Sequence, residues 1–220
     1  MEYYSVCIGQ VGAGKSSFIN SILKHGNNYN ENNKCTTGAS WRGVTKVLDQ
    51  KFIDKGNDRF YFIDTPGLDE ANVDEENIKR LRDELSGRIE NVSRIRCILL
   101  VMKVTDYRLT NGIQQIIIEL MNCFPSPNFW EHVLIIRTHC IEKNQITTIQ
   151  GNFEDIIKND IKIREAMNKK GIKLPNKFKE FYVNSIDEYN CLEPYRYNNS
   201  DEIEKILNEI ETIGSKIFYT

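Results

Sequence analysis

The stretch VCIGQVGAGKSSFINSIL (residues 6–23) joins a short apolar run to a glycine-rich turn and then to a helical pattern. The apolar run is typical of a buried strand in a parallel sheet. Gly9, Gly12 and Gly14 remove side chains where the backbone must turn and approach a ligand closely. Apolar residues then recur at helical spacing up to Leu23. The stretch therefore predicts a strand, a glycine loop and a helix N-terminus in direct succession.

The spacing Gly9-x-x-x-x-Gly14-Lys15-Ser16 is that of the phosphate-binding P-loop. Backbone N–H groups at a helix N-terminus, together with the helix dipole, favour an anion at that place. In this motif the lysine reaches the β- and γ-phosphates, and the serine hydroxyl ligates Mg²⁺. The predicted nucleotide-binding residues of the loop are Gly9, Gln10, Val11, Gly12, Ala13, Gly14, Lys15, Ser16 and Ser17.

The composition is that of a globular chain with one sizeable core. It has 220 residues, of which 40% are hydrophobic and 27% are charged. We expect a single domain over residues 1–220, with a nucleotide-binding core over about residues 4–190 and a C-terminal helix within about 191–220. The formal net charge is −2, so nothing in the charge balance suggests nucleic acid or an anionic membrane as a bulk partner. We therefore expect no nucleic-acid partner.

The six cysteines form no C-x-x-C pair, and the three histidines lie away from zinc-ligand spacing. This usage is typical of a reduced, intracellular protein. The N-terminus runs directly into the first apolar stretch, so we expect no signal peptide. The longest apolar run, Cys97–Met102, is far too short to cross a bilayer. The sequence predicts a cytoplasmic protein whose chain encodes no membrane anchor.

Strand-like and helix-like segments alternate along the chain. The expected strands are Tyr3–Ile8, Lys46–Ile53, Arg59–Ile63, Cys97–Val104, His132–Arg137 and Lys179–Val183. The expected helices are Lys15–Lys24, Glu75–Glu90, Asn111–Phe124, Phe153–Asn168 and Ser200–Ser215. The alternation predicts an α/β fold with a mostly parallel central sheet and helices on both faces. The segment KGND (residues 55–58) breaks it and predicts an antiparallel hairpin at the sheet edge.

A second motif, FYFIDTPGL, places Asp64 at the end of an apolar strand. An aspartate there can hold Mg²⁺ through water, as in P-loop NTPases. Gly67 follows three residues later, and its backbone N–H can meet a γ-phosphate. The alternative is a plain Pro-Gly turn. Together with the P-loop, the motif favours a P-loop NTPase G domain that binds GTP or GDP with Mg²⁺.

A threonine is expected to bring its hydroxyl to Mg²⁺ and its backbone to the γ-phosphate. The candidates are Thr36, Thr37 and Thr45. Thr45 immediately precedes the strand that leads through the hairpin to Asp64, so we choose it as the metal ligand and catalytic-site threonine. The other two lie in or next to the polar segment His25–Lys34, which is expected to be a mobile, nucleotide-sensing loop.

Selection of guanine needs a carboxylate that accepts two N–H bonds from the base, which adenine cannot offer. In HVLIIRTHCIEKN this carboxylate is Glu142, and His139 is placed to cover the base face. The alternative for His139 is a neutral histidine that bonds a backbone group at the strand end. Asn184, in FYVNSID, is placed to meet guanine O6.

These motifs resemble those of the immunity-associated AIG/GIMAP GTPases, which are close to septins and chloroplast Toc GTPases. The resemblance covers residues 4–210 and rests on GQVGAGKSSFINSIL, GVTKV, FIDTPGL, DYRLTNGIQQ, IIRTHCIEKN and FYVNS. It supports Thr45, and it implies GTP-controlled self-assembly as a homodimer or oligomer across the nucleotide face. It also implies peripheral membrane association for some members. Cys140 and Glu142 depart from the family's lysine and aspartate.

Leu68 stands directly after the D-x-x-G motif, where Ras-type enzymes place a water-orienting glutamine. An apolar side chain cannot hold that water, so we expect slow GTP hydrolysis. Arg108 is a candidate catalytic group acting on a partner subunit, and its alternative is a solvated surface arginine. Two functions therefore stay open: a slow, dimer-assisted GTPase, or a nucleotide-gated scaffold with negligible turnover. A P-loop ATPase or kinase is a third.

Overall fold

The structure is a computed structural model that describes residues 1–26, 29–30, 32–37, 49–65, 95–140, 152–184 and 199–214. In chain order, the elements before the middle of the chain are β1 (Glu2–Ile8), α1 (Lys15–His25), β2 (Asp49–Lys55), β3 (Asp58–Asp64) and β4 (Ile95–Lys103). The later elements are α3 (Asn111–Cys123), η3 (Phe129–His132), β5 (Val133–Thr138), α5 (Asn152–Asn159), α6 (Ile161–Lys170), β6 (Lys179–Tyr182) and α7 (Asn199–Gly214).

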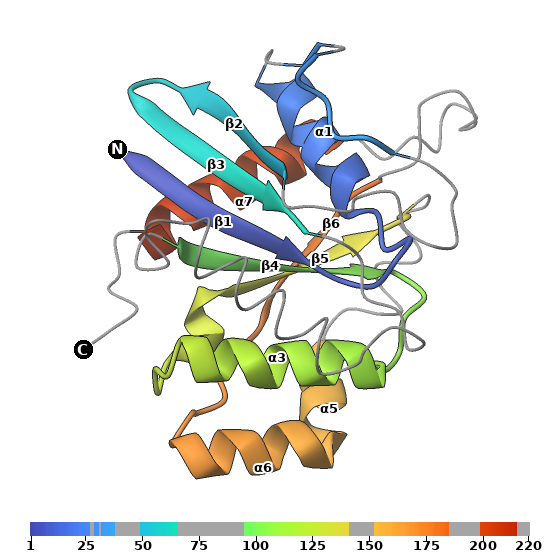
Figure 1. The fold of residues 1–220 in the computed structure, drawn as a ribbon, viewed down its shortest axis with the longest axis vertical. Coiled ribbons are helices and arrows are strands. Elements are labelled where there is room, and N and C mark those ends of the chain that lie inside the picture. Colours follow the sequence, from blue (N-terminus) through green and yellow to red (C-terminus); the bar gives the residue numbers. More distant parts are fainter. Residues whose placement is uncertain are drawn as a thin grey trace.

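A single six-stranded sheet forms the centre of the fold, with strand order β2-β3-β1-β4-β5-β6 (Figure 1). Every described pairing is parallel except that of β2 with β3. The predicted fold class, a mostly parallel sheet with one antiparallel edge strand, is confirmed. Because β1, β3, β4 and β5 run in the same direction, their carboxyl ends meet at one edge of the sheet.

The antiparallel edge is the hairpin predicted from KGND. Lys55 of β2 pairs with Asp58 of β3, so a two-residue turn joins the strands. Gly56 has φ +61°, a left-handed conformation that suits this tight connection. β2 continues two residues beyond the predicted end at Ile53, and its described part begins at Asp49. The first three predicted residues, 46–48, lie outside the described ranges.

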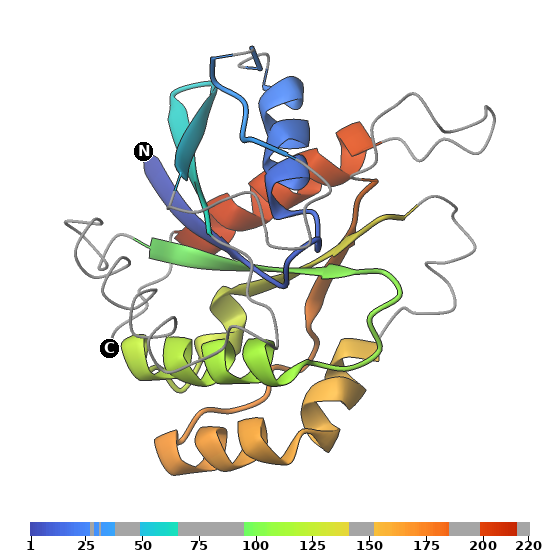
Figure 2. The ribbon, with the colours of Figure 1, turned by 45° about the vertical axis from the view of Figure 1, so that its right-hand side comes forward.

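Two hydrophobic cores lie on opposite faces of the sheet. α3, α5 and α6 cover one face, and α1 and α7 cover the other (Figures 1 and 2). Successive side chains of β1 point to opposite faces of the sheet and so contribute to both cores. Val6 and Ile8 pack on the side of α3, whereas Cys7 packs on the side of α1 and α7. Ile210 of α7 is fully buried in the second core, so the C-terminal helix is part of this packing.

The predicted helix Phe153–Asn168 is wrong as a single element, since the structure divides it into α5 and α6. Asp160 stands between them in an extended conformation, and its side chain accepts a hydrogen bond from the backbone N–H of Ile163. The same carboxylate accepts a bond from Gln114 of α3 at 2.6 Å. An N-cap aspartate therefore starts a new helix and fixes it against α3. The predicted helix Glu75–Glu90 lies outside the described residues.

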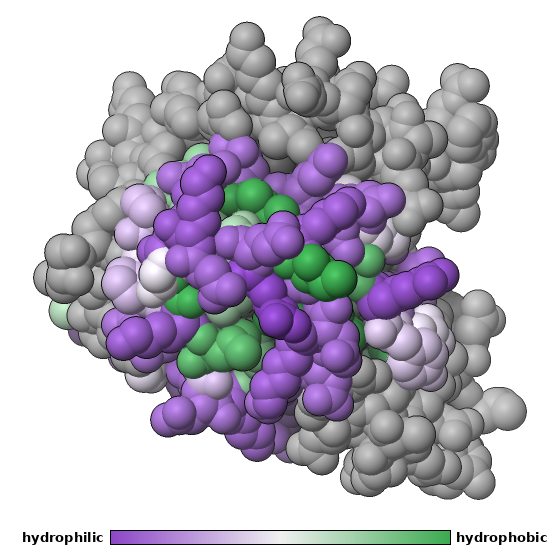
Figure 3. All heavy atoms as spheres, turned by 90° about the horizontal axis from the view of Figure 1, so that it is seen from below, coloured by the Kyte–Doolittle hydropathy of each residue, from purple (hydrophilic) through white to green (hydrophobic). Residues whose placement is uncertain are grey.

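The outer surface over α6 is mainly hydrophilic, and its hydrophobic patches are small and separated (Figure 3). Ile161, at the start of α6, is 68% exposed. Single exposed apolar residues of this kind are normal on a protein surface. None of the described helices is long and apolar enough to cross a bilayer.

The burial of α7 makes the single-domain expectation testable. Ile210→Ala should lower the free energy of unfolding by about 2–5 kcal/mol, because it leaves a cavity in a closed core. The matched control Ile161→Ala removes the same atoms from an exposed position and should change stability by less than about 0.5 kcal/mol. Urea denaturation measures both. Equal midpoints for the two variants would show that α7 does not unfold with the rest of the domain.

Candidate functional site

The turn between β1 and α1 requires glycine at three positions. Gly12 and Gly14 have φ +72° and +86°, in the left-handed region that residues with a Cβ rarely adopt. Gly9 has a different reason: a Cβ built on it would lie 2.3 Å from the carbonyl oxygen of Val101 in β4. The loop therefore starts in direct backbone contact with the neighbouring strand and then winds tightly into the N-terminus of α1.

Lys15, the first residue of α1, lies inside this loop. Its side chain is buried, with 6% exposure, and its ammonium donates hydrogen bonds to the carbonyl oxygens of Gly9 and Gln10, both at 3.1 Å. A buried ammonium held by carbonyl dipoles is a positive centre, and the N-terminal N–H groups of α1 surround the same space. This arrangement fits a phosphate group, as the spacing of the motif predicted.

Ser16 and Asp64 come together at the carboxyl ends of adjacent strands. The Ser16 hydroxyl donates a hydrogen bond of 2.6 Å to Oδ2 of Asp64, which is almost fully buried at the end of β3. The next residue, Thr65, fixes this strand end by donating from its hydroxyl to the carbonyl oxygen of Cys7 at 2.7 Å. A hydroxyl and a carboxylate beside a phosphate-binding loop are oxygen ligands of the kind that Mg²⁺ prefers. The predicted metal residues Ser16 and Asp64 therefore fit this ion.

Three predicted site residues, Thr45, Gly67 and Glu142, lie outside the described residues, so their roles stay predictions. Thr36 and Thr37, the alternatives to Thr45, are described and are exposed. The segment before them is attached to α1, because Asn20 exchanges two hydrogen bonds with the backbone of Cys35, at 3.0 and 2.7 Å.

Thr138 attaches the end of β5 to the P-loop. Its buried hydroxyl lies 2.6 Å from the carbonyl oxygen of Ala13, 3.2 Å from that of Met102 and 3.0 Å from Nδ1 of His139. The sequence analysis did not single out Thr138, although it stands directly before the predicted base-binding histidine. A hydrogen-bonding, β-branched residue at the end of an apolar strand was the available signal.

His139 adopts φ +60°, the only positive φ at a non-glycine residue among those described. Such a conformation costs about 1–3 kcal/mol and is concentrated at functional sites. Burial, and next the positive charge of Lys103, lower the pKa of His139 below its ordinary value, so the imidazole is neutral at pH 7. The neutral state agrees with the alternative for this residue, but the bond shown joins the ring to the Thr138 hydroxyl and not to a backbone group.

Cys140 is fully buried and packs with Val104 and Tyr182. Its backbone N–H donates to the carbonyl oxygen of Val183 at 3.3 Å. This bond brings the end of β5 beside Asn184, which is itself buried. The fold therefore brings His139 and Asn184 to the same edge of the sheet, and their base-binding roles stay predictions.

The comparison with known families decides the class of protein. Residues 5–128, more than half of the chain, match the family MMR_HSR1, described as 50S ribosome-binding GTPase. The chain belongs to this GTPase family. No curated protein matches its sequence. The resemblance to the AIG/GIMAP group within the P-loop GTPases stays a prediction.

Solved structures with the same fold are GTPase G domains. Toc33 from Arabidopsis thaliana in complex with GDP and Mg²⁺ is 17% identical and superposes with a TM-score of 0.67, over 97% of this chain and 84% of that one. The complex of Toc33 with Mg²⁺ and GMPPNP is 19% identical and superposes with a TM-score of 0.65, over 97% of this chain and 85% of that one. The small GTPase Arl6 from Trypanosoma brucei, with the bound nucleotide analogue GppNp, is 10% identical and superposes with a TM-score of 0.53, over 99% of both chains. The likeness shows the G-domain fold.

In this G domain, Arg108 lies on the connection between β4 and α3 and is exposed. The neighbouring Tyr107 is 60% exposed. Exposure is required for a residue that reaches a partner subunit, but it is equally typical of a solvated surface arginine. The catalytic role of Arg108 therefore stays a prediction.

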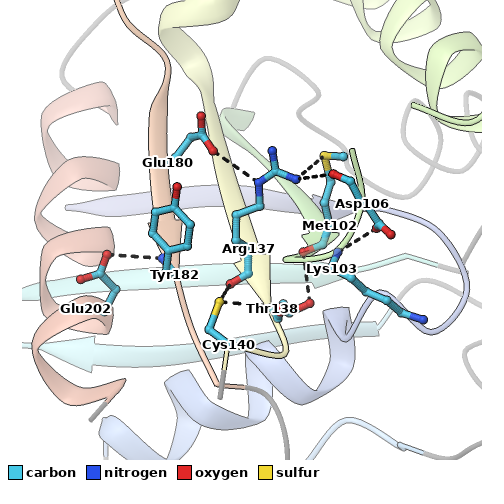
Figure 4. Close-up of polar contacts among 9 residues, drawn as sticks. All are labelled: Met102, Lys103, Asp106, Arg137, Thr138, Cys140, Glu180, Tyr182 and Glu202. Carbon is cyan, nitrogen blue, oxygen red and sulfur yellow. Dashed lines mark hydrogen bonds and ion pairs between the residues drawn. The ribbon is translucent and has the colours of Figure 1, made fainter. Parts of the chain in front are cut away.

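A buried arginine lies among the residues that end β4 and β5 (Figure 4). Arg137 of β5 has no exposed surface. Its Nε lies 3.3 Å from Oε2 of Glu180 in β6, and its terminal nitrogen donates to the carbonyl oxygen of Asp106 at 3.0 Å. Asp106 in turn accepts a bond from the backbone N–H of Lys103. One guanidinium thus joins β5, β6 and the connection that carries Arg108, a role that the apolar strand pattern gave no reason to expect.

Removing one partner of this ion pair should be far more damaging than removing both. Arg137→Met leaves the Glu180 carboxylate buried without its cation and should cost about 3–5 kcal/mol of unfolding free energy. The double variant Arg137→Met, Glu180→Leu should recover most of that loss, because no buried charge remains. Urea denaturation of the single and double variants measures the difference. Additive losses would contradict the buried-pair interpretation.

Proposed function

We propose that this chain is a guanine-nucleotide switch that binds GTP and GDP with Mg²⁺ and hydrolyses GTP slowly, assisted by dimerisation. The observation that carries the proposal is the 2.6 Å contact between Ser16, at the start of α1, and Asp64, at the end of β3. It joins the P-loop to the strand end that carries the D-x-x-G motif. Membership of a GTPase family and the Toc33-like fold support the same conclusion.

The residues divide into phosphate and base groups along one edge of the sheet. Lys15 and the loop N–H groups are proposed to bind the phosphates, and Ser16 and Asp64 are proposed to hold Mg²⁺; the contacts of Lys15 in the loop and of Ser16 with Asp64 support this. When bound, Mg²⁺ would neutralise phosphate charge. His139 and Asn184 are proposed to bind the base, with Glu142 as the carboxylate that reads guanine. An ATPase or kinase is the alternative, and competition of ATP against labelled GTP distinguishes it.

Dimerisation enters the proposal because Leu68 offers no means of orienting water. For Toc33 and a related translocon component, dimerisation is important for GTPase activity, and an arginine-to-alanine substitution makes Toc33 dimerisation deficient. We carry this behaviour over to the present chain, with the exposed Arg108 acting across a homodimer.

The second candidate function is a nucleotide-gated scaffold, which the apolar Leu68 favours. Such a scaffold assembles with GTP, disassembles with GDP and has negligible turnover. Under either function, we propose that the protein is cytoplasmic and that any attachment to a membrane is peripheral. The dependence of hydrolysis on protein concentration separates the two functions.

The phosphate site is tested first by charge removal. Lys15→Ala should weaken GDP binding at least 100-fold, because the phosphates lose the cation inside the loop. The control Lys24→Ala removes an exposed lysine from the same helix and should leave the affinity within about twofold. Isothermal titration calorimetry with GDP, in Mg²⁺, measures both. Equal affinity of wild type and Lys15→Ala would overturn the P-loop assignment.

The rate of GTP hydrolysis tests whether dimerisation assists the reaction. Single-turnover GTP hydrolysis should rise with protein concentration in wild type, and Arg108→Ala should reduce the rate at high concentration by about 10³-fold, the contribution of an arginine supplied in trans. GDP affinity should stay near wild type. Arg164→Ala, at an exposed position on α6, is the control and should hydrolyse GTP normally. A measurable rate that does not depend on concentration would remove the dimer from the mechanism. Negligible turnover with GTP-dependent assembly would select the scaffold.

A further inference from the structure

Lys103 is the last residue of β4, the strand that lies between β1 and β5. The P-loop follows β1, and His139, which we propose to bind the base, follows β5. Lys103 pairs in register with Thr138, the residue that bonds to Ala13 of the P-loop. The position of Lys103 in the sheet is therefore between the groups placed for phosphate and those placed for the base.

The Lys103 side chain extends toward the P-loop and away from the guanidinium of Arg137 (Figure 4). A Cβ built on Gly12 would lie 3.8 Å from the Lys103 ammonium, which places this charge beside the loop at Gly12. The same charge contributes to lowering the pKa of His139. The ammonium thus lies near both the loop and the histidine.

No carboxylate neutralises this ammonium within the described part of the chain. Lys103 is partly buried, and its side chain makes no hydrogen bond or ion pair with another described residue. The nearby Asp106 carboxylate accepts from the Lys103 backbone N–H instead. Partly buried cations usually have an anionic partner. Beside the P-loop there is therefore a second positive charge, distinct from Lys15, that has no anionic partner among the described residues.

We propose that Lys103 is a nucleotide-binding residue that contacts the sugar–phosphate junction of the bound nucleotide, between the P-loop and the base. This inference rests on the proposed function and extends it by one residue. The junction is the part of a nucleotide that lies between phosphate and base, and its α-phosphate oxygens are anionic. An ammonium serves there as a point charge and needs no bidentate geometry.

Calorimetric titration of GDP tests the proposal. Lys103→Met keeps the length and apolar stem of the side chain and should weaken GDP binding about tenfold, the effect of one charge-assisted contact. Lys103→Arg should retain most of the affinity, because the charge remains. The plot of log Kd against log salt should be less steep in Lys103→Met, which a purely structural role would not produce. Lys169→Met, on the exposed surface of α6, is the control.

Two further readouts locate the contact. The ratio of GDP to ADP affinity should stay as in wild type, because the sugar–phosphate junction is common to both nucleotides. In NMR titrations of the free protein, the pKa of His139 should rise in Lys103→Met, since a repelling charge has been removed. A changed GDP to ADP ratio would overturn the junction assignment in favour of base recognition.

The outcomes for Lys103 and for the proposed function are distinguishable. Wild-type GDP affinity and an unchanged salt slope in Lys103→Met, while Lys15→Ala abolishes binding, would overturn the Lys103 proposal alone. Failure of the wild type to bind GDP or GTP would overturn both. A tenfold loss with a reduced salt slope, restored in Lys103→Arg, supports the proposal.

Discussion

The contact between the Gly9 backbone and the Val101 carbonyl is the constraint on which the rest of the site depends. With only 2.3 Å available for a Cβ, the first residue of the P-loop lies directly against β4. The far side of the loop is fixed by Thr138, which bonds to Ala13 from the end of β5. Three strand ends therefore hold one loop.

These contacts set the spacing of the residues at the edge of the sheet where we propose that the nucleotide binds. Because β4 and β5 are both fixed to the loop, Lys103 stands over Gly12 and His139 follows immediately beyond. Beneath them, the guanidinium of Arg137 joins the next strand and the β4–α3 connection. A preorganised edge of this kind can bind a ligand without first ordering its own parts, which lowers the entropic cost of binding.

Local patterns in the sequence were enough to predict the fold class, the glycine-rich turn between β1 and α1, the position of Asp64 at a strand end and the edge hairpin. Each of these depends on residues close together in the chain: glycines at fixed spacing, an apolar run ending in aspartate, or the turn KGND. The helix break at Asp160 was missed although an N-cap aspartate is a local signal, because the apolar pattern continues through it.

The contacts of Thr138 and Arg137 and the position of Lys103 could not be predicted in the same way. Each depends on which strands are neighbours and in what register, and those long-range pairings are not written in the local pattern. Arg137 stands in an apolar strand, and its burial is explained by Glu180 on the adjacent strand and by the carbonyl oxygen of Asp106. Lys103 acquires its place over Gly12 only after β1 and β4 are paired.

The central claim is that the P-loop and the Ser16–Asp64 pair form a site for a guanine nucleotide with Mg²⁺. A crystal structure of the chain grown with GMPPNP and Mg²⁺ tests this most directly. The account predicts β- and γ-phosphates inside the loop at Lys15, a Mg²⁺ ion ligated by the Ser16 hydroxyl and held by Asp64 through water, and the base beside His139. Phosphates bound elsewhere, or a loop that excludes them while Ser16 and Asp64 stay hydrogen-bonded, would contradict it.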